Sequence, residues 1–488
     1  MISLGFWNLI ILIAVAFILK INWRLDDEKL AWKNSLFLQH PLIKRLVQFL
    51  RQPIVKLLLQ VVIILVVTRF LLYTGWFIYF LTHNPEPPYR DFRWFYVASQ
   101  LAHQHLSPFN VETFSGAFCT INDLKKTCGV APFVYPPNII PLIWFLGYFS
   151  INTAFTIWTL MHVLAIGLLL WGSNILLESR SRCFRTICTI AVVLIDGVVR
   201  DMQLANITIF VVVFVLWVFI LAQKHQDILA GILLGIAVCK PTLALLFIPY
   251  FLLKKRFFLV FVSIATAASL TFIGLFLTGN SLIQFLSDAS HAFAIWINDP
   301  PNSPYVSVSR FDLQVIGPRL LPNNPLIAKL FSDLIVLILV GLVGLYFYKK
   351  QFLTAWSKEI YLPEKVLICC LSLGINYSQY YSSAMLVPVV IFLLNDLLYQ
   401  IRNCAFSWKR MSIWLSGVGC LAVHTGAIRG LLIFPVVNRF NWGKGELPYI
   451  LKVTIIALPS YAILGITLSV LVLAITSINQ KHNTEFKH

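Results

Sequence analysis

Charged side chains are scarce in this sequence: they make up only 12% of its 488 residues, while hydrophobic residues make up 59%. Soluble domains usually carry about twice that share of charge. The chain also contains many apolar runs of about 18 residues or more, the length needed to cross a hydrocarbon core of about 30 Å. The composition therefore excludes a soluble enzyme and predicts an all-α, polytopic membrane protein, because helices satisfy their backbone hydrogen bonds inside the bilayer.

Acidic residues are rarer than basic ones, 20 against 38, which gives a net charge of +18. In a membrane protein, Lys and Arg concentrate in the cytoplasmic loops. Assigning the loops by this rule gives about 12–13 transmembrane helices, with the N-terminus outside and the C-terminus inside. The basic excess is thus a signal of topology, and we expect membrane lipids but no nucleic acid as partners.

Motifs of soluble catalysis are missing. We find no P-loop, no Rossmann glycine fingerprint and no Ser/His/Asp arrangement, and the nine cysteines have no zinc-site spacing. Cys119 and Cys128 fall in a predicted extracytoplasmic loop, where a pair nine residues apart can close a small disulfide loop. The remaining cysteines are scattered through predicted helices or near the inner face, where free thiols are ordinary.

The chain shows no separate soluble domain. We expect an extra N-terminal transmembrane helix and a basic cytoplasmic loop in residues 1–54, and a membrane core in residues 55–400. C-terminal helices and a cytoplasmic tail follow in residues 401–488. Two long extracytoplasmic loops, residues 83–151 and 279–325, interrupt the core and contain much of its polar sequence.

A carboxylate stands just beyond a membrane exit in the first of these loops. Asp91 follows a Pro-rich breaker at residues 83–88 and begins a predicted amphipathic helix that runs to about His105. An acid beside lipid is costly and usually functional, although its carboxylate can also simply cap the helix. Farther along, residues 133–149 are too short to span the bilayer and predict an interfacial or re-entrant segment.

A second charge is predicted at membrane depth. The apolar runs on either side of Lys240-Pro241 are each too short to cross the bilayer comfortably. We therefore expect two short helices that meet at Lys240-Pro241, below the outer surface of the membrane. Gly231 and Gly235 permit close helix contact at a spacing of four. A buried ammonium needs an anionic partner, which is either a lipid phosphate or a protein carboxylate such as Asp201.

Other polar and aromatic groups are predicted on the same outer face. Residues 200–206 read as a polar turn between helices near 186–199 and 206–222. The second long loop contains Trp296 and Arg310, and a hairpin turn is predicted at residues 376–381. Aromatic and amide groups suit the faces and hydroxyls of carbohydrates, but they also suit an interfacial belt.

The order of these motifs resembles that of a known family. The motifs are Asp91-Phe92-(x)2-Phe95-Tyr96-x-Ala98, Ser107-Pro108-Phe109, Tyr135-Pro136-Pro137 and Ala230-Gly231-(x)3-Gly235-(x)4-Lys240-Pro241. Together they resemble glycosyltransferase family 87, membrane glycosyltransferases of the C-type fold that include polyprenyl-phosphate-mannose-dependent α-mannosyltransferases. The resemblance covers roughly residues 55–400.

This resemblance implies a sugar donor on a polyprenyl-phosphate carrier, a lipid or glycan acceptor, and an inverting reaction with Asp91 as the general base. It implies a bacterial plasma membrane, with the active site facing the periplasm or exterior. The chain departs from many relatives at His105-Leu106, where they carry a Gly, and at Gln379, where some carry a His. These differences bear on how the acceptor is handled.

Site residues follow from the resemblance and from charge. Lys240, Arg200 and Arg310 are the cations expected to stabilise the leaving phosphate. Residues expected to contact the sugar or the acceptor are Tyr96, Tyr135, Asp201, Gln203, Asn206, Trp296, Gln379 and Tyr380. No cofactor is expected, and no DxD-like pair beside Asp91 requires a divalent metal, although the sequence does not exclude one. The alternative is a transporter, flippase or polymerase of lipid-linked saccharides; polar groups on one face and the lack of an internal repeat argue against transport.

Overall fold

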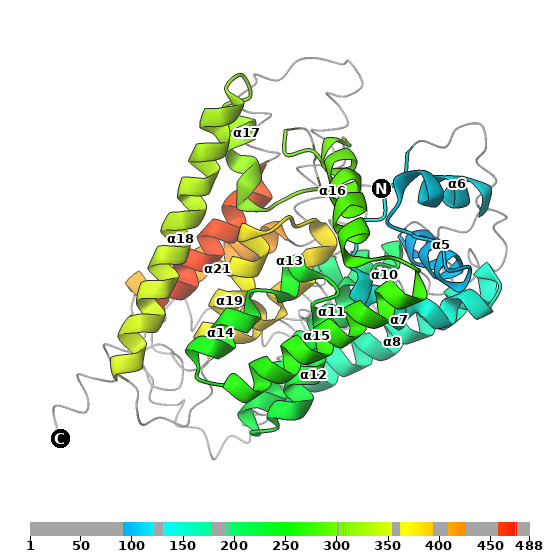
Figure 1. The fold of residues 1–488 in the computed structure, drawn as a ribbon. Helices are drawn as coiled ribbons and strands as arrows, with labels where there is room; N and C mark the ends of the chain where they lie inside the picture. The colour runs from blue at the N-terminus through cyan, green and yellow to red at the C-terminus, as the bar shows by residue number, and fades with distance from the viewer. Residues whose placement is uncertain are drawn as a thin grey trace, which may run out of the picture.

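The computed structural model describes residues 91–121, 130–176, 192, 195–299, 302–305, 307, 309–353, 362–393, 408–424, 457–473 and 475. Within these residues every named element is a helix (Figure 1), and the β-structure is limited to one isolated bridge between Arg310 and Gln379. The predicted all-α class is confirmed. The predictions for residues 1–90 and 425–456 lie outside the described residues.

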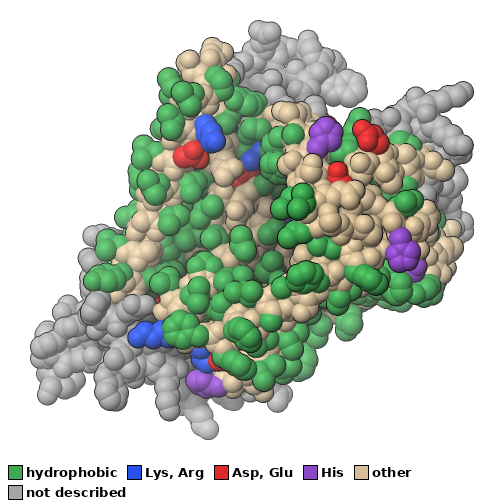
Figure 2. Space-filling model, viewed as in Figure 1, with side chains coloured by type: hydrophobic (Ala, Val, Ile, Leu, Met, Phe, Trp, Pro, Cys, Tyr) green, Lys and Arg blue, Asp and Glu red, His purple; other side chains and the backbone are tan. Residues whose placement is uncertain are grey.

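Three helices of the described chain are long and apolar enough to cross a membrane. They are α8 (Ile151–Leu176), α15 (Phe257–Leu277) and the first 24 residues of α18 (Pro325–Leu353). Large apolar side chains such as Phe272 and Phe276 on α15 are mostly exposed, and hydrophobic side chains spread over the face in Figure 2. A surface of this kind suits contact with lipid.

The first loop folds into short helices that pack on one another. They are α5 (Phe92–His103), α6 (Val111–Ile121), η2 (Pro137–Ile139), α7 (Ile140–Ile143) and η3 (Trp144–Tyr148). Ser99 Oγ of α5 donates to the carbonyl of Trp144 at 2.9 Å. Gly274 of α15 lies so close to Pro137 that an added Cβ would be 2.0 Å from its carbonyl oxygen. Residues 133–149 are therefore a broken segment packed against the bundle, as predicted.

One predicted turn is wrong. Residues 200–206 were expected to connect two helices, but helix α10 (Asp196–Leu204) includes most of them. The reversal is confined to three residues before α11 (Thr208–Gln223), with Ala205 at φ +53°. Packing explains the difference, because Gly197 brings α10 against η5 (Tyr380–Leu386) so closely that a Cβ would lie 2.2 Å from the Ala384 nitrogen.

The two predicted short helical segments on either side of Lys240 are present, and the second is divided into two helices. Helix α12 (Asp227–Ala237) is followed by α13 (Pro241–Ala244) and α14 (Phe247–Leu253), and Lys240 stands at the junction. Gly231 and Gly235 face α15, where added Cβ atoms would approach backbone oxygens to 2.7 and 2.6 Å. Small side chains thus allow α12 and α15 to meet backbone to backbone.

The second long loop is more helical than predicted. It contains α16 (Leu282–Asn298), η4 (Leu313–Val315) and α17 (Ile316–Leu320). After α18 come α19 (Leu362–Ile375), η5 (Tyr380–Leu386), α21 (Trp408–Val423) and a last described helix at residues 457–473.

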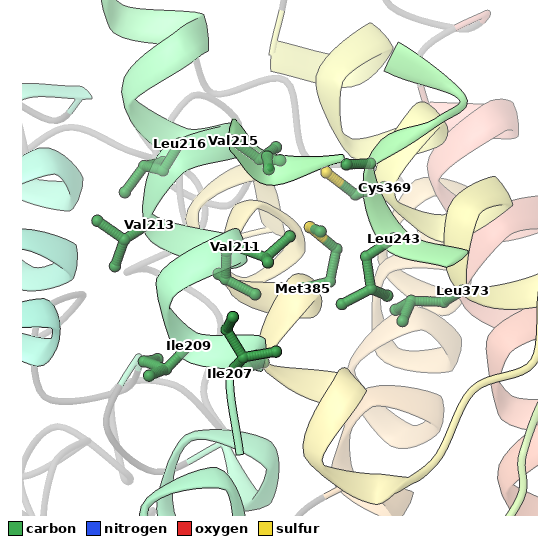
Figure 3. Close-up of a cluster of buried hydrophobic side chains, with 14 of the residues drawn as sticks. Ile207, Ile209, Val211, Val213, Val215, Leu216, Leu243, Cys369, Leu373 and Met385 are labelled. Atoms are coloured by element: carbon green, nitrogen blue, oxygen red, sulfur yellow. The ribbon is translucent and has the colours of Figure 1, made fainter. Parts of the chain in front are cut away.

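A buried apolar cluster joins α11 to the second half of the chain. Figure 3 shows Val211 and Val215 of α11 facing Leu243 of α13, Cys369 of α19 and Met385 of η5. All of these side chains are at most 1% exposed. The cluster fixes the start of α11 relative to Lys240 and η5, and this is where the polar residues gather.

The close contact of α12 and α15 generates a stability prediction. In Gly235→Ala the new methyl group would meet the Ser263 carbonyl oxygen and Thr266 Cβ, both 2.6 Å away. Such overpacking costs about 1–3 kcal/mol, so thermal unfolding in detergent should begin at a lower temperature. Gly344→Ala is the matched control, because nothing lies within 4 Å of its Cβ position. Equal melting of both variants would contradict the predicted contact.

Candidate active site

Asp91 is at the N-cap position of α5, yet its side chain accepts no capping hydrogen bond. Its backbone N–H donates to the carbonyl of Leu204 at 3.0 Å, which ties the start of α5 to the end of α10. Its carboxylate oxygen Oδ2 instead accepts a hydrogen bond of 2.7 Å from Asn206 Nδ2. The interpretation of Asp91 as a simple helix cap is therefore not supported.

Asn206 connects this carboxylate to the predicted cation. Its Oδ1 accepts from Lys240 Nζ at 2.9 Å and from the backbone N–H of Thr208 at 3.2 Å. Both of these groups can only donate, so Oδ1 must face them and Nδ2 must face Asp91. The result is a continuous chain from Asp91 through Asn206 to Lys240, in which Asn206 is 1% exposed.

The ammonium of Lys240 has neutral partners. Besides Asn206, it donates to Thr208 Oγ1 at 2.5 Å and lies 4.4 Å from the ring centroid of Tyr381. The alternative partner considered from the sequence was Asp201, but in the described part of the chain Lys240 forms no salt bridge with it. The Asp201 and Asp91 carboxylates are near enough to attract Lys240, but the hydrogen bonds of its ammonium go to neutral groups, so this buried cation is suited to binding an anion.

Asp201 has contacts of a different kind. It is fully buried, and its Oδ2 accepts from the backbone N–H of Ile209 at 2.8 Å. His162 Nε2 lies 3.6 Å from the same oxygen and 2.8 Å from the Asn206 carbonyl oxygen. Trp158 Nε1 donates to the Ala205 carbonyl at 2.9 Å. These contacts anchor the start of α11 and thereby hold Asn206 in place.

Two tyrosines extend the site. Asn206 Nδ2 is 3.3 Å from Tyr135 Oη, and burial, followed by the nearby Asp91 carboxylate, raises the pKa of Tyr135 well above its usual value. Burial is also the main cause of a raised pKa at Tyr377, to which Asp91 contributes. Both hydroxyls therefore stay protonated at neutral pH and can donate hydrogen bonds.

A second polar cluster holds the loop before α17 to the turn before η5. Arg310 donates through Nε and Nη2 to both oxygens of Asp312, at 3.0 and 2.8 Å, and through Nη1 to the Asn302 carbonyl at 2.9 Å. Asn302 Oδ1 in turn accepts from Tyr377 Oη at 2.7 Å and from Gln379 Nε2 at 3.0 Å. All of these Arg310 contacts are structural, so the prediction that it binds phosphate has no support in this geometry.

The remaining predicted residues lie around this centre. Tyr96 donates to the Phe149 carbonyl at 3.0 Å, which joins α5 to the end of η3. Tyr380 is buried with its ring centroid 6.0 Å from that of Phe311. Arg200 and Gln203 lie on α10, where Arg200 is half-buried.

Cys119, on α6, is disulfide-bonded. Cys128, its expected partner, lies outside the described residues, so that pairing stays a prediction.

A cavity of about 670 Å³ opens between α5 and α16. The backbone N–H of Trp94 donates to the backbone carbonyl of Asp91 at 3.1 Å. Trp94, which forms one wall of the cavity, is therefore one helical turn from Asp91. Trp296, which was predicted to contact sugar, contributes to the other wall. The lining residues are Trp94, Val130, Pro132, His291, Ala294, Ile295, Trp296, Asn298, Asp299 and Asn302.

Several of these groups were not predicted from the sequence. Thr208 and Tyr381 are adjacent to predicted residues in the chain, and a search for polar neighbours at the start of α11 and η5 could have found them. His162 lies within an apolar helix and gives no such signal. Among the described residues, no group of three His, Cys, Asp or Glu side chains could hold a metal ion.

Comparison with known families gives one match. Residues 133–359 match the model of glycosyltransferase family 87, which confirms the resemblance stated from the motifs. The matched segment contains Tyr135-Pro136-Pro137 and Lys240-Pro241, whereas Asp91 precedes it. No curated protein and no solved structure matches the chain.

Two buried charges should differ in their effect on folding. Lys240→Met removes the desolvation cost of a buried cation but also its attraction to the nearby Asp201 and Asp91 carboxylates, and because these two effects oppose each other the net loss of stability should be small. Asp201→Ala leaves the buried Ile209 N–H without its acceptor and removes the carboxylate beside the His162 ring, which should cost about 3 kcal/mol or more. We expect detergent-solubilised Lys240→Met to melt near the wild type and Asp201→Ala well below it. Equal losses would instead make Lys240 a structural residue.

Proposed function

We propose that this chain is a glycosyltransferase of family 87, whose model it matches over residues 133–359, and that it transfers a sugar from a polyprenyl-phosphate carrier to an acceptor hydroxyl with inversion. The match supports a membrane glycosyltransferase in general. The hydrogen-bonded chain Asp91–Asn206–Lys240 is the observation that carries the finer proposal, because it holds a base and a buried cation on either side of one amide.

Asp91 is the general base of the proposed reaction. Asn206 occupies Oδ2 of its carboxylate and fixes the orientation of the group, while the residue as a whole remains partly exposed. A fixed, partly accessible carboxylate can accept the proton of an incoming hydroxyl. Tyr135 and Asn206 supply neighbouring donors that can orient the hydroxyls of a sugar.

Lys240 stabilises the leaving group. The phosphodiester of the donor carries one negative charge, and its release as polyprenyl phosphate adds a second. A buried ammonium with neutral partners is suited to this developing charge, because few water molecules or counterions compete for it. The charge of Arg310 is already matched by Asp312, so Lys240 is the cation that the described contacts favour.

The bond changes balance. The acceptor oxygen attacks the anomeric carbon and forms the new glycosidic bond, and its proton passes to the Asp91 carboxylate. The bond between the anomeric carbon and the phosphate oxygen breaks, and its electron pair leaves with polyprenyl phosphate. Attack and departure on opposite faces invert the configuration, as in other displacements that use one carboxylate base.

The resemblance and the topology supply the remaining parts of the proposal, which are the sugar, the acceptor and the side of the membrane. Mannose is the first choice of sugar, and a lipid or glycan is the acceptor. The distribution of Lys and Arg favours the extracytoplasmic face for Asp91, and the resemblance implies a bacterial plasma membrane. A lipid-linked donor reaches Lys240 from the bilayer, while the acceptor reaches Asp91 from the aqueous side.

Sugar transfer tests this proposal directly. Membranes containing the wild-type chain would be incubated with a panel of radiolabelled polyprenyl-phosphate sugars and assayed for label in endogenous lipids and glycans. Loss of the base in Asp91→Asn should lower the rate by about 10²–10⁴-fold, and Lys240→Met by about 10²–10³-fold. Transfer from one donor also identifies the sugar.

Glu112→Gln serves as the control, because Glu112 is an exposed carboxylate on α6 in the same loop. It should transfer sugar at the wild-type rate. Undiminished transfer by Asp91→Asn at matched expression would remove Asp91 from the mechanism. No transfer by the wild type with any donor of the panel would contradict the donor class.

A further inference from the structure

The cavity between α5 and α16 is lined by two tryptophans, Trp94 and Trp296, and each packs against other aromatic rings. The Trp94 ring lies 5.4 Å from Phe114 at an interplanar angle of 22° and 5.0 Å from Phe118. The Trp296 ring lies 4.3 Å from Tyr377 and 5.7 Å from Phe293. Both indoles are only partly buried and line the cavity. Such rigid, amphipathic surfaces bind the apolar faces of ligands at low entropic cost.

The polar groups of the cavity suit a neutral ligand rich in hydroxyls. Asn298, Asp299, Asn302 and His291 offer both donors and acceptors. The side chains that line the cavity in the described structure include no Lys or Arg, and the Asp299 carboxylate would repel an anion. A phosphate therefore fits poorly here, in contrast to the surroundings of Lys240.

The size and position of the cavity point to the acceptor. Its volume of about 670 Å³ lies in the range of roughly 300–1,000 Å³ typical of sites that bury a drug-sized ligand, which a disaccharide resembles in size. On the α5 side of the cavity, Trp94 is one helical turn from Asp91. On the α16 side, Asn302 accepts a hydrogen bond from Tyr377. A sugar chain bound against Trp94 would extend toward the base along the first turn of α5.

We propose that this cavity binds the acceptor as a saccharide of at least two units, with Trp94 and Trp296 contacting successive sugar rings. The inference rests on the proposed function, since it specifies the acceptor of the same reaction centre. It assigns the two substrates to different places: the lipid-linked donor at Lys240, and the neutral glycan between the two tryptophans.

Binding of simple glycosides without any donor tests the inference. The full chain in lipid nanodiscs would be titrated with methyl mannoside, methyl mannobioside, methyl glucoside and methyl maltoside, and saturation-transfer NMR would report binding. We expect a disaccharide to bind more tightly than its monosaccharide. Trp296→Ala should weaken that binding about three- to tenfold. Trp171→Ala is the control, because Trp171 is an exposed tryptophan of α8 outside the cavity.

Asp299→Asn is a second variant that tests the same inference if Trp296→Ala fails to fold. Asp299 is exposed, so its replacement removes a carboxylate acceptor with little effect on packing, and disaccharide binding should again weaken. The inference is overturned if no probe binds the wild type, or if wild-type binding is unchanged in both variants. Because no donor is present, sugar transfer can fail while this binding persists, and the two proposals fail separately.

Discussion

The orientation of a single carboxamide determines the geometry of the proposed reaction centre. The Lys240 ammonium and the backbone N–H of Thr208 can only donate, and both face Oδ1 of Asn206. The amide nitrogen is consequently directed at Asp91, 115 positions earlier in the chain. One neutral side chain thus separates a base from a cation that would otherwise neutralise each other by direct pairing. This separation leaves the carboxylate able to accept a proton and the ammonium able to attract phosphate.

The surrounding fold serves to hold that amide. Asp201, His162 and Trp158 bind the backbone at the end of α10 and the start of α11. The buried cluster in Figure 3 fixes α11 against α13 and η5, and the glycines of α12 allow its close contact with α15, which positions the helix that precedes Lys240. The cavity between α5 and α16 lies on the accessible side of this assembly. The two substrate sites that we propose are therefore separate, one at Lys240 and one in this cavity.

Much of this arrangement follows from local sequence. Composition predicts the helical class, and the short apolar runs on either side of Lys240-Pro241 predict the pair of short helices. Asp91, Asn206 and Lys240 stand out as polar residues at membrane boundaries. Local patterns fail where distant packing decides: α10 forms in a stretch that reads as a turn because Gly197 packs against η5. The pairing of the Arg310 guanidinium with Asp312 is likewise not evident from the sequence, and a role for Arg310 at the phosphate stays a prediction. His162, inside an apolar helix, becomes recognisable only through contacts with α10 and the start of α11.

The central claim is that Lys240 holds the donor phosphate while Asp91 faces the acceptor. An experimental structure of the chain in nanodiscs, with a polyprenyl phosphonate sugar that cannot be transferred, tests it most directly. The account predicts the phosphonate oxygens within hydrogen-bonding distance of Lys240 Nζ and the anomeric carbon between that site and Asp91. A phosphonate bound at Lys254 near the opposite end of α14, or against Arg310, would contradict it.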